Sequence, residues 1–218
     1  MSTMKLEVKD GVHVLTLTNN EHENAFNLDV TLEYLAALDA VEAYEGNTAL
    51  LITCLHEKTF STGIDLNWLM SSGPDMPATF VKSLETVMYR LATLNVPTVM
   101  CLNGNTYAGG AILACGADFR LMRSDRGRFC FPEVNINIPF TELMAEMINL
   151  LPNKHALKHM ALTGVAYTGE ECKRLDIVDE IFPMDTLQSQ AFELAKSLAG
   201  KDRATYTTIK HSLRPKIM

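Results

Sequence analysis

The chain has 218 residues, of which 47% are hydrophobic and 21% charged, a composition typical of a globular protein with a substantial core. Its 19 Lys and Arg residues against 26 acidic residues give a formal net charge of −7, which disfavours nucleic acids and anionic membranes as partners. The longest apolar runs, such as Ala111–Ala117, fall far short of the roughly 20 residues that cross a bilayer, so no transmembrane helix is expected.

The N-terminal segment and the cysteines indicate the compartment. Met1–Asp10 carries acidic residues and soon becomes strand-like, so we expect neither a secretory signal nor a transit peptide, and the protein is predicted to be cytoplasmic. Five cysteines without a Cys-x-x-Cys pair indicate buried free thiols. His155 and His159 share one face of a predicted helix, but Ala156 replaces the glutamate of the zinc-protease pattern, so no metal site is predicted.

The first part of the chain alternates strands and helices. Lys5–Lys9 and Val12–Thr18 alternate apolar and polar residues around Asp10-Gly11, which predicts a hairpin, and a polar loop over Asn19–Asn27 leads to a helix at Leu28–Tyr44. The next predicted elements are a strand at Thr48–Cys54, helices beginning at Asp65 and Phe80, a strand at Pro97–Leu102, a Gly-rich turn at Gly104–Gly110, a helix at Ala111–Ala117 and a strand at Asp118–Met122.

Beyond Pro139 the pattern becomes mainly helical. A single short strand is expected at Ile177–Phe182, among helices at Thr141–Leu151, Lys154–Leu162, Gly169–Leu175, Thr186–Leu198 and Asp202–Leu213. We therefore predict an α/β fold with mostly parallel strands in one domain, residues 1–218. Residues 1–138 would form its core and residues 139–218 a mainly helical C-terminal part, with functional groups in the loops that follow strands.

Two glycine-containing loops each follow a predicted strand and precede a helix, Phe60–Leu66 and Asn103–Gly110. Glycine lets a ligand approach the main chain, and free N–H groups at a helix start favour negative charge, so both loops suit an oxyanion or a phosphate. The alternative is that the glycines merely allow the chain to turn. Neither loop matches a phosphate-binding P-loop or the G-x-G-x-x-G pattern, which disfavours ATP and nicotinamide enzymes.

The third feature is Glu133, a carboxylate within the apolar stretch Phe129–Ile136. Loss of water penalises the charged form and raises the pKa of a buried carboxyl toward the range useful for proton transfer at neutral pH. The alternative is a structural salt bridge from Glu133 to Arg126 or Arg128.

Together these features resemble the crotonase superfamily, the enoyl-CoA hydratase/isomerase family, from Met4 to about Pro215. Phe60–Leu66 is similar to its Phe-[Ser/Ala]-x-Gly-x-Asp-[Leu/Ile] loop, Asn103–Gly110 to its Asn-Gly-x-x-x-x-Gly-Gly loop, and Pro132-Glu133 to its Pro-Glu position. The resemblance implies a crotonase-like ββα spiral core with a C-terminal helical segment that is shortened relative to the family. It also implies a homo-oligomer, either a trimer or a dimer of trimers.

The resemblance also implies a mechanism. In this family one N–H group from each loop holds the thioester carbonyl of an acyl-CoA and stabilises an enolate, and the matching positions are Ile64 and Gly109. Hydratases carry a second glutamate where this chain has Ile112, so Glu133 alone would move a proton from C2 to C4. This single-glutamate pattern is similar to that of compact Δ3,Δ2-enoyl-CoA isomerases in fatty acid β-oxidation. It needs no metal and no cofactor, because coenzyme A is part of the substrate.

Substrate contacts follow from the same resemblance. Coenzyme A would lie along Ser61–Leu66, that is Ser61, Thr62, Gly63, Asp65 and Leu66, and Lys58 is a candidate phosphate partner or simply a solvated lysine. Asp65 is also expected to cap the following helix. Further candidates near the acyl chain are Trp68, Leu69, Met88, Tyr107, Gly110, Ile112, Ile136 and Phe140.

Several other functions remain open at this point. A hydratase could use Glu133 as its only acid/base group, and a catalytically silent acyl-CoA-binding protein could keep the two loops as a thioester clamp. Thioester hydrolysis, dehalogenation and decarboxylation use the same loops with one or two different side chains. Ala108 also replaces the first of three glycines that often stand in the second loop.

Overall fold

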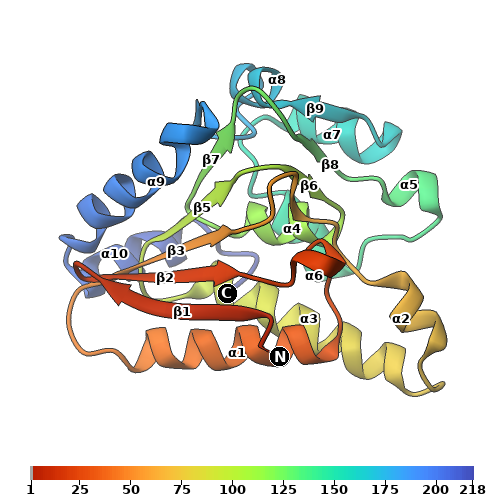
Figure 1. Cartoon of the computed structure of the whole chain (residues 1–218), viewed down its shortest axis with the longest axis horizontal. Coiled ribbons are helices and arrows are strands. Elements are labelled where there is room, and N and C mark those ends of the chain that lie inside the picture. The colour runs from red at the N-terminus through yellow and green to blue at the C-terminus, as the bar shows by residue number, and fades with distance from the viewer. Residues whose placement is uncertain (1) are drawn as a thin grey trace.

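The computed structural model describes residues 2–218 and has a mixed α/β fold (Figure 1). Within these residues there is one six-stranded and one four-stranded sheet. The larger sheet consists of Met4–Lys9 (β1), Val12–Leu17 (β2), Ala49–Cys54 (β3), Thr98–Leu102 (β5), Phe119–Arg123 (β7) and Glu180–Phe182 (β10). Their order across the sheet is β1-β2-β3-β5-β7-β10.

The predicted N-terminal hairpin is confirmed. β1 and β2 are antiparallel with Lys9 opposite Val12, and Asp10 and Gly11 between them have φ angles of +49° and +78°. Positive φ at both central positions is what makes Asp-Gly a favoured two-residue hairpin turn. All later neighbours in this sheet are parallel. The carboxyl ends of β3, β5 and β7 therefore lie along one edge.

The smaller sheet has the order β4-β6-β8-β9 and consists of Thr59–Ser61 (β4), Asn105–Tyr107 (β6), Arg128–Cys130 (β8) and Ala166–Thr168 (β9). Its strands follow those of the larger sheet in the chain, since β4, β6 and β8 come after β3, β5 and β7. The helices that follow its first three strands are Leu66–Ser71 (α2), Gly109–Cys115 (α4) and Glu133–Ile136 (α5). This strand–strand–helix repeat is the ββα organisation that the resemblance implies.

None of the four strands of the small sheet was predicted from the sequence. β4 overlaps the predicted loop Phe60–Leu66, the Gly104–Gly110 turn contains β6, the apolar stretch Phe129–Ile136 is divided between β8 and α5, and β9 is a second strand after residue 139. Each of these strands has three residues, which is too short to show the alternation by which strands of four to eight residues are recognised.

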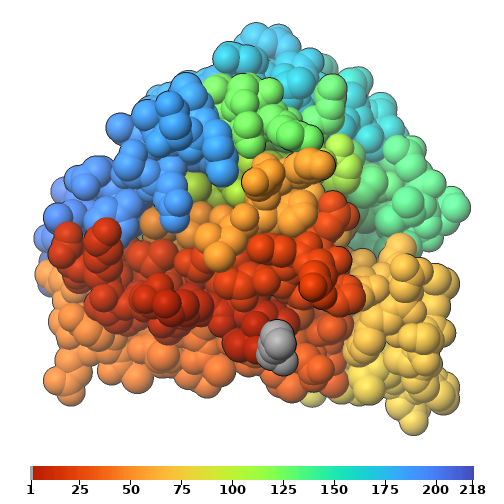
Figure 2. All heavy atoms as spheres, in the orientation of Figure 1, coloured from red at the N-terminus to blue at the C-terminus, as the bar shows by residue number. Residues whose placement is uncertain are grey.

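Helices cover both faces of the larger sheet. On one face, Leu28–Ala43 (α1) packs beside Met76–Thr93 (α3), and α3 begins earlier than predicted because Pro77 suits the first turn of a helix. On the other face, Leu187 and Ala191 of Met184–Ala199 (α9) pack against side chains of β2, β3, β5 and β7. Figure 2 shows the N-terminal hairpin lying against α9, where the Lys196 ammonium is 3.1 Å from the Asp10 carboxylate.

The C-terminal part packs on the same core as the strands before it. Its other helices are Glu142–Ile148 (α6), Lys154–Thr163 (α7), Gly169–Arg174 (α8) and Arg203–Ser212 (α10). Met147 of α6, Met160 of α7 and Ile217 belong to the hydrophobic cluster that α1, α3 and the larger sheet also form.

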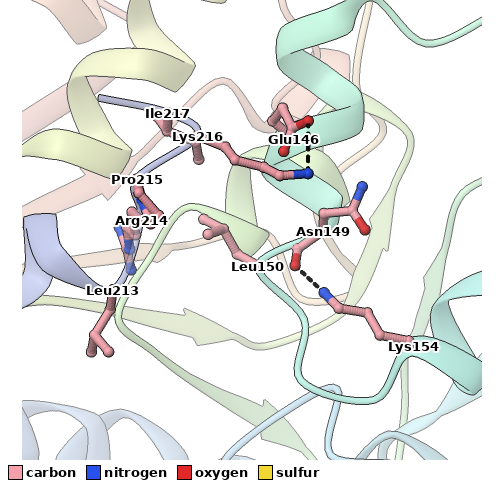
Figure 3. Close-up of a pocket in the computed structure, with 9 residues that line it drawn as sticks. All are labelled: Glu146, Asn149, Leu150, Lys154, Leu213, Arg214, Pro215, Lys216 and Ile217. Atoms are coloured by element: carbon pink, nitrogen blue, oxygen red, sulfur yellow. Dashed lines mark hydrogen bonds and ion pairs between the residues drawn. The ribbon is translucent and has the colours of Figure 1, made fainter.

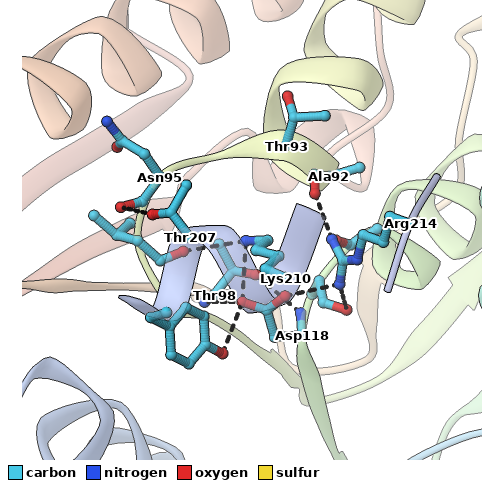
Figure 4. Close-up of polar contacts among 12 residues, drawn as sticks. Ala92, Thr93, Asn95, Thr98, Asp118, Thr207, Lys210 and Arg214 are labelled. Atoms are coloured by element: carbon cyan, nitrogen blue, oxygen red, sulfur yellow. Dashed lines mark hydrogen bonds and ion pairs between the residues drawn. The ribbon is translucent and has the colours of Figure 1, made fainter. Parts of the chain in front are cut away.

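A buried cluster of charges fastens α10 to the larger sheet (Figure 4). The Asp118 carboxylate lies 3.0 Å from Nζ of Lys210 and 2.7 Å from the Arg214 guanidinium, and it also accepts hydrogen bonds from the Tyr206 hydroxyl and the Thr98 N–H. Burial lowers the pKa of Lys210 to about 8, although the neighbouring Asp118 acts in the opposite direction. The pairing matters because an unpaired buried charge would be costly.

Candidate functional site

The two glycine loops are in direct contact. Gly63 has φ of +83°, and a Cβ atom added to it would lie 2.6 Å from the Gly109 nitrogen and 2.8 Å from Cβ of Ala108. A Cβ added to Gly110 would lie 2.7 Å from Cβ of Ser61. Glycine is therefore needed at Gly63 and Gly110 for the approach of the loops as well as for the turn, so the purely local interpretation of these glycines is too narrow.

The main-chain N–H of Ile64 has no protein acceptor within residues 2–218. Phe26 forms hydrogen bonds with both neighbours of Ile64. The Phe26 N–H donates to the Gly63 carbonyl at 2.7 Å, and the Phe26 carbonyl accepts from the Asp65 N–H at 2.9 Å. Because N–H groups of successive extended residues point to opposite sides, the Ile64 N–H faces away from Phe26. It is available to an acceptor outside the chain.

The Gly109 N–H is in the same situation at the start of α4, with no acceptor in the described part of the chain. The preceding residue, Ala108, has φ of +49° and ψ of −128°, a conformation that side chains disfavour. This strain accompanies the replacement of glycine by alanine in the second loop.

Glu133 opens α5 immediately after β8 and is 6% exposed. Its Oε2 atom is buried without a hydrogen-bond partner within residues 2–218, and burial raises the pKa of the carboxyl to about 7. No ion pair joins it to Arg126 or Arg128 in the described chain. The salt-bridge alternative is therefore wrong, and Glu133 is a desolvated carboxyl with a pKa suited to proton exchange near neutrality.

Ile64, Gly109 and Glu133 line one cavity of about 220 Å³. Three separate ββα repeats contribute them, which is why residues distant in sequence meet here. Glu133 is the one carboxylate among the described lining residues. The cavity thus combines two unpaired N–H donors with a single carboxyl group in mostly apolar surroundings.

The other predicted contacts divide into two groups. Thr62, Leu66, Tyr107, Ile112 and Ile136 also line this cavity, and Ile112 is 1% exposed. An apolar side chain therefore occupies the position of the second hydratase glutamate.

The remaining candidates lie elsewhere. Asp65 caps α2 as expected, its carboxylate accepting from the Trp68 N–H at 2.9 Å. Trp68 packs edge-on against Phe80 with a centroid separation of 5.2 Å, while Met88 is buried within the hydrophobic core. Lys58 is exposed, and Ser61, Gly63 and Gly110 lie where the two loops meet. The predicted contact residues that do not line the cavity are therefore Lys58, Ser61, Gly63, Asp65, Trp68, Leu69, Met88, Gly110 and Phe140.

Sequence reasoning missed part of the apolar wall. Val81 reaches the cavity from α3, and Met144 reaches it from α6. Their patterns fit ordinary core residues of amphipathic helices, and only the packing of those helices brings them to the site. Ile138, Pro139 and Thr141 also line the cavity, and their short distance in sequence from Glu133 could have indicated this.

Two other cavities border α6. One of about 580 Å³ shares Glu133, Ile138 and Pro139 with the first and is lined beyond them by Phe140 and Leu162 among others. Another, of about 280 Å³, lies between α6 and the C-terminal residues, where Lys216 is 3.7 Å from the Glu146 carboxylate (Figure 3). It contains none of the residues of the three motifs.

No set of three His, Cys, Asp or Glu side chains in residues 2–218 is arranged to hold a metal ion. His159 instead bonds through Nδ1 to the Tyr167 hydroxyl at 2.7 Å. The five cysteines are free and buried, as expected from their spacing. Across the same residues, no helix has the length and hydropathy of a membrane span.

Comparison with known proteins now identifies the family. The family model described as enoyl-CoA hydratase/isomerase matches residues 7–218, so this chain belongs to the enoyl-CoA hydratase/isomerase family. The chain is 32% identical over 220 residues to enoyl-CoA delta isomerase 3 of Arabidopsis thaliana, covering 97% of this chain and 92% of that protein. It is 30% identical over 222 residues to the peroxisomal enoyl-CoA delta isomerase 2 of the same plant, with the same coverage.

Solved structures confirm the predicted crotonase-like fold. A Mycobacterium tuberculosis protein described as a probable enoyl-CoA hydratase superposes with a TM-score of 0.92 at 24% identity, covering 99% of this chain and 90% of that one. An enoyl-CoA hydratase/isomerase family protein from Pseudomonas syringae gives a TM-score of 0.90 at 23% identity.

Proposed function

We propose that this protein is an enoyl-CoA isomerase that moves the double bond of a 3-enoyl-CoA from C3–C4 to C2–C3. The observation that carries the proposal is the cavity shared by one desolvated carboxyl, Glu133, and the two unpaired N–H groups of Ile64 and Gly109. The delta isomerase names of the two Arabidopsis proteins support the same reaction.

In this mechanism the Glu133 carboxylate removes a proton from C2. The electrons of that C–H bond form a C1–C2 double bond while the carbonyl π electrons move onto the thioester oxygen, which gives the dienolate. When the oxygen re-forms the carbonyl, the C1–C2 π electrons become the C2–C3 double bond, and the former C3–C4 π electrons take the proton of the Glu133 carboxylic acid at C4. One proton leaves C2 and one arrives at C4, so the reaction is balanced and Glu133 returns to its ionised form. A pKa of about 7 suits both halves of this exchange.

The N–H groups of Ile64 and Gly109 would form an oxyanion hole for the thioester oxygen while the dienolate exists. Loss of one such donor typically costs about 2.7–4 kcal/mol of transition-state stabilisation. Both donors belong to the main chain, so the loop conformation rather than any side chain supplies this stabilisation.

Ile112 favours isomerisation over hydration. An apolar side chain at this place can neither orient nor deprotonate water, and Glu133 is the one carboxylate that the described cavity offers. A proton shuttle between two carbons needs one acid/base group, whereas the family's hydratases use two.

We propose in addition a substrate class, an oligomeric state and a cellular compartment for this protein. The substrate is an acyl-CoA thioester, with Lys58 as a phosphate partner, and no metal or further cofactor takes part. We also propose a homotrimer or dimer of trimers in the cytoplasm. Exposed apolar side chains such as Val134, at 47% exposure, support an oligomer, and free buried cysteines suit a reducing compartment. Light scattering on the purified protein tests the oligomer.

The deciding experiment compares 3-enoyl-CoA and 2-enoyl-CoA as substrates for the wild type and for Glu133→Gln. We expect the wild type to convert 3-enoyl-CoA to 2-enoyl-CoA, and the variant to lose at least about 10²-fold in kcat while still binding the thioester. Glu142→Gln, which alters an exposed carboxyl on α6 outside the cavity, is the matched control. Oxygen incorporation from isotopic water would instead indicate a hydratase, and binding without exchange of the C2 proton would indicate a silent binding protein.

A further inference from the structure

The segment Glu23–Phe26, which appears in the sequence as part of a polar loop, runs beside the first donor loop and bonds to nearly every residue of it. The Glu23 carbonyl accepts from the Thr62 N–H at 3.3 Å. Asn24 Nδ2 donates to the Phe60 carbonyl at 3.0 Å, and the Asn24 carbonyl accepts from the Ser61 hydroxyl at 2.8 Å. Together with the two main-chain bonds of Phe26, these contacts hold the loop on both sides of Ile64 while its N–H stays without an acceptor in the described residues.

The side chain of Phe26 reaches the second donor loop. A Cβ atom added to Gly109 would lie 3.3 Å from Cδ2 and 3.4 Å from Cε2 of Phe26. The ring is 1% exposed and is held from behind by Tyr34, edge-on at a centroid distance of 6.0 Å. One residue therefore fixes the main chain around Ile64 and packs against Gly109.

We propose that Phe26 is a positioning residue that sets the separation and direction of the two N–H donors. This inference rests on the proposed function, because it concerns how the same oxyanion hole is held. Oxyanion donors work when they lie about 2.7–3.1 Å from the developing charge, and a misplacement of about 1 Å can cost about 10²-fold in rate.

Phe26 acts as a spacer because its main chain and its ring contact different elements. Its backbone is bonded to Gly63 and Asp65 in the loop before α2, whereas its ring faces the first residue of α4. A shorter side chain keeps the backbone bonds but leaves a space beside Gly109 into which the start of α4 can shift. The Ile64 donor stays in place while the Gly109 donor moves.

The test uses Phe26→Leu and also Phe26→Met, whose flexible unbranched side chain refills part of the space left by the ring and so favours folding. Two measurements are made: kcat and KM on 3-enoyl-CoA, and the infrared carbonyl stretch of bound hexanoyl-CoA carrying ¹³C at the thioester carbon. We expect about a tenfold fall in kcat with KM changed by less than about threefold, since the donors act mainly in the transition state. We also expect a smaller displacement of the carbonyl band than in the wild type.

Leu187→Ala is the matched control, because Leu187 is equally buried but belongs to the separate cluster between α9 and the larger sheet. It is expected to lower the melting temperature and leave the carbonyl band and kcat unchanged. A full wild-type band displacement with wild-type kcat in both Phe26 variants would overturn the positioning role.

The spectroscopic arm separates this inference from the proposed reaction, because hexanoyl-CoA has no double bond to move. If the wild type displaces the carbonyl band but does not convert 3-enoyl-CoA, the proposed function is wrong while the Phe26 comparison still decides the positioning role. A double-mutant cycle that combines Gly109→Ala with Phe26→Leu is a second test of the positioning role. The added Cβ would lie only 3.3 Å from the ring, so we expect non-additive effects on the band, and additive effects would contradict the spacer.

Discussion

Gly63 and Gly109 approach so closely that a Cβ atom on Gly63 would come within 2.6 Å of the Gly109 nitrogen. Gly63→Ala is therefore expected to push the two loops apart as well as to strain a residue with φ of +83°. We expect the free energy of unfolding to fall by about 1–3 kcal/mol, and kcat to fall by 10-fold or more, about the loss expected from one misaligned donor. Gly73→Ala, whose added Cβ meets nothing within 4 Å, is the control in thermal melts and rate assays.

The raised pKa of Glu133 predicts how activity depends on pH. The base must be ionised to remove the C2 proton, so kcat/KM should fall with decreasing pH through about 7 as one proton binds. A pH–rate profile of the free enzyme with its acidic limb near pH 4.5 would show that Glu133 is not desolvated as described.

The same shift predicts how stability depends on pH. Between the unfolded pKa of about 4.5 and the folded pKa of about 7, the native protein holds a proton that the unfolded chain has released. The contribution of Glu133 to stability is thus complete below this window and is lost as pH rises through it. Glu133→Gln should melt higher than the wild type at about pH 8, and this advantage should shrink at about pH 4.

Ile112→Glu places a second carboxyl in the cavity of Glu133. We expect it to introduce measurable formation of 3-hydroxyacyl-CoA from 2-enoyl-CoA, detected by ¹⁸O incorporation, and to lower stability because Ile112 is 1% exposed. Ile112→Gln has nearly the same shape without the carboxylate and should not hydrate. Equal hydration by both variants would show that the carboxylate is not responsible.

Ala108→Gly removes a Cβ from a residue with φ of +49°. We expect the free energy of unfolding to rise by about 1 kcal/mol, because glycine adopts this conformation without strain. Ala111→Gly, inside the α4 helix that follows Ala108, is the comparison and should lower stability by about 1 kcal/mol. Chemical denaturation measures both, and a loss of stability in Ala108→Gly would mean that the Cβ contributes more by packing than it costs in strain.

Asp118→Asn leaves the buried charges of Lys210 and Arg214 without their carboxylate (Figure 4). Removal of one partner of a buried pair costs about 3–5 kcal/mol, so a large drop in melting temperature is expected, with kcat retained below the transition. Glu7→Gln breaks an exposed pair with Lys5 and should cost less than about 1 kcal/mol. Similar losses in both variants would contradict the role of burial.

Local chemistry made much of this fold predictable. Asp10-Gly11 sets the hairpin, the apolar periodicity of α9 sets its buried face, and Asp65 caps α2 where the sequence indicates a helix start. The desolvation of Glu133 was also predictable, because a carboxylate among apolar residues has few partners nearby in the sequence.

What could not be predicted depends on contacts between distant segments. The strands of the small sheet are too short to show a periodicity, and their pairing arises only when the repeats stack. Phe26 is an isolated apolar residue in a polar loop, and its importance lies in contacts with residues about 40 and 80 positions later. Val81 and Met144 reach the cavity through helix packing, which no local pattern encodes.

Glu133, Ile138 and Pro139 form a wall with a hollow on each side. Glu133 consequently contributes to both hollows: one also contains the paired amides of Ile64 and Gly109, whereas the wider outer hollow does not. A small apolar inhibitor seated in the outer hollow would block the acid/base group without competing for the thioester clamp, and kinetically it would act as a noncompetitive rather than a competitive ligand.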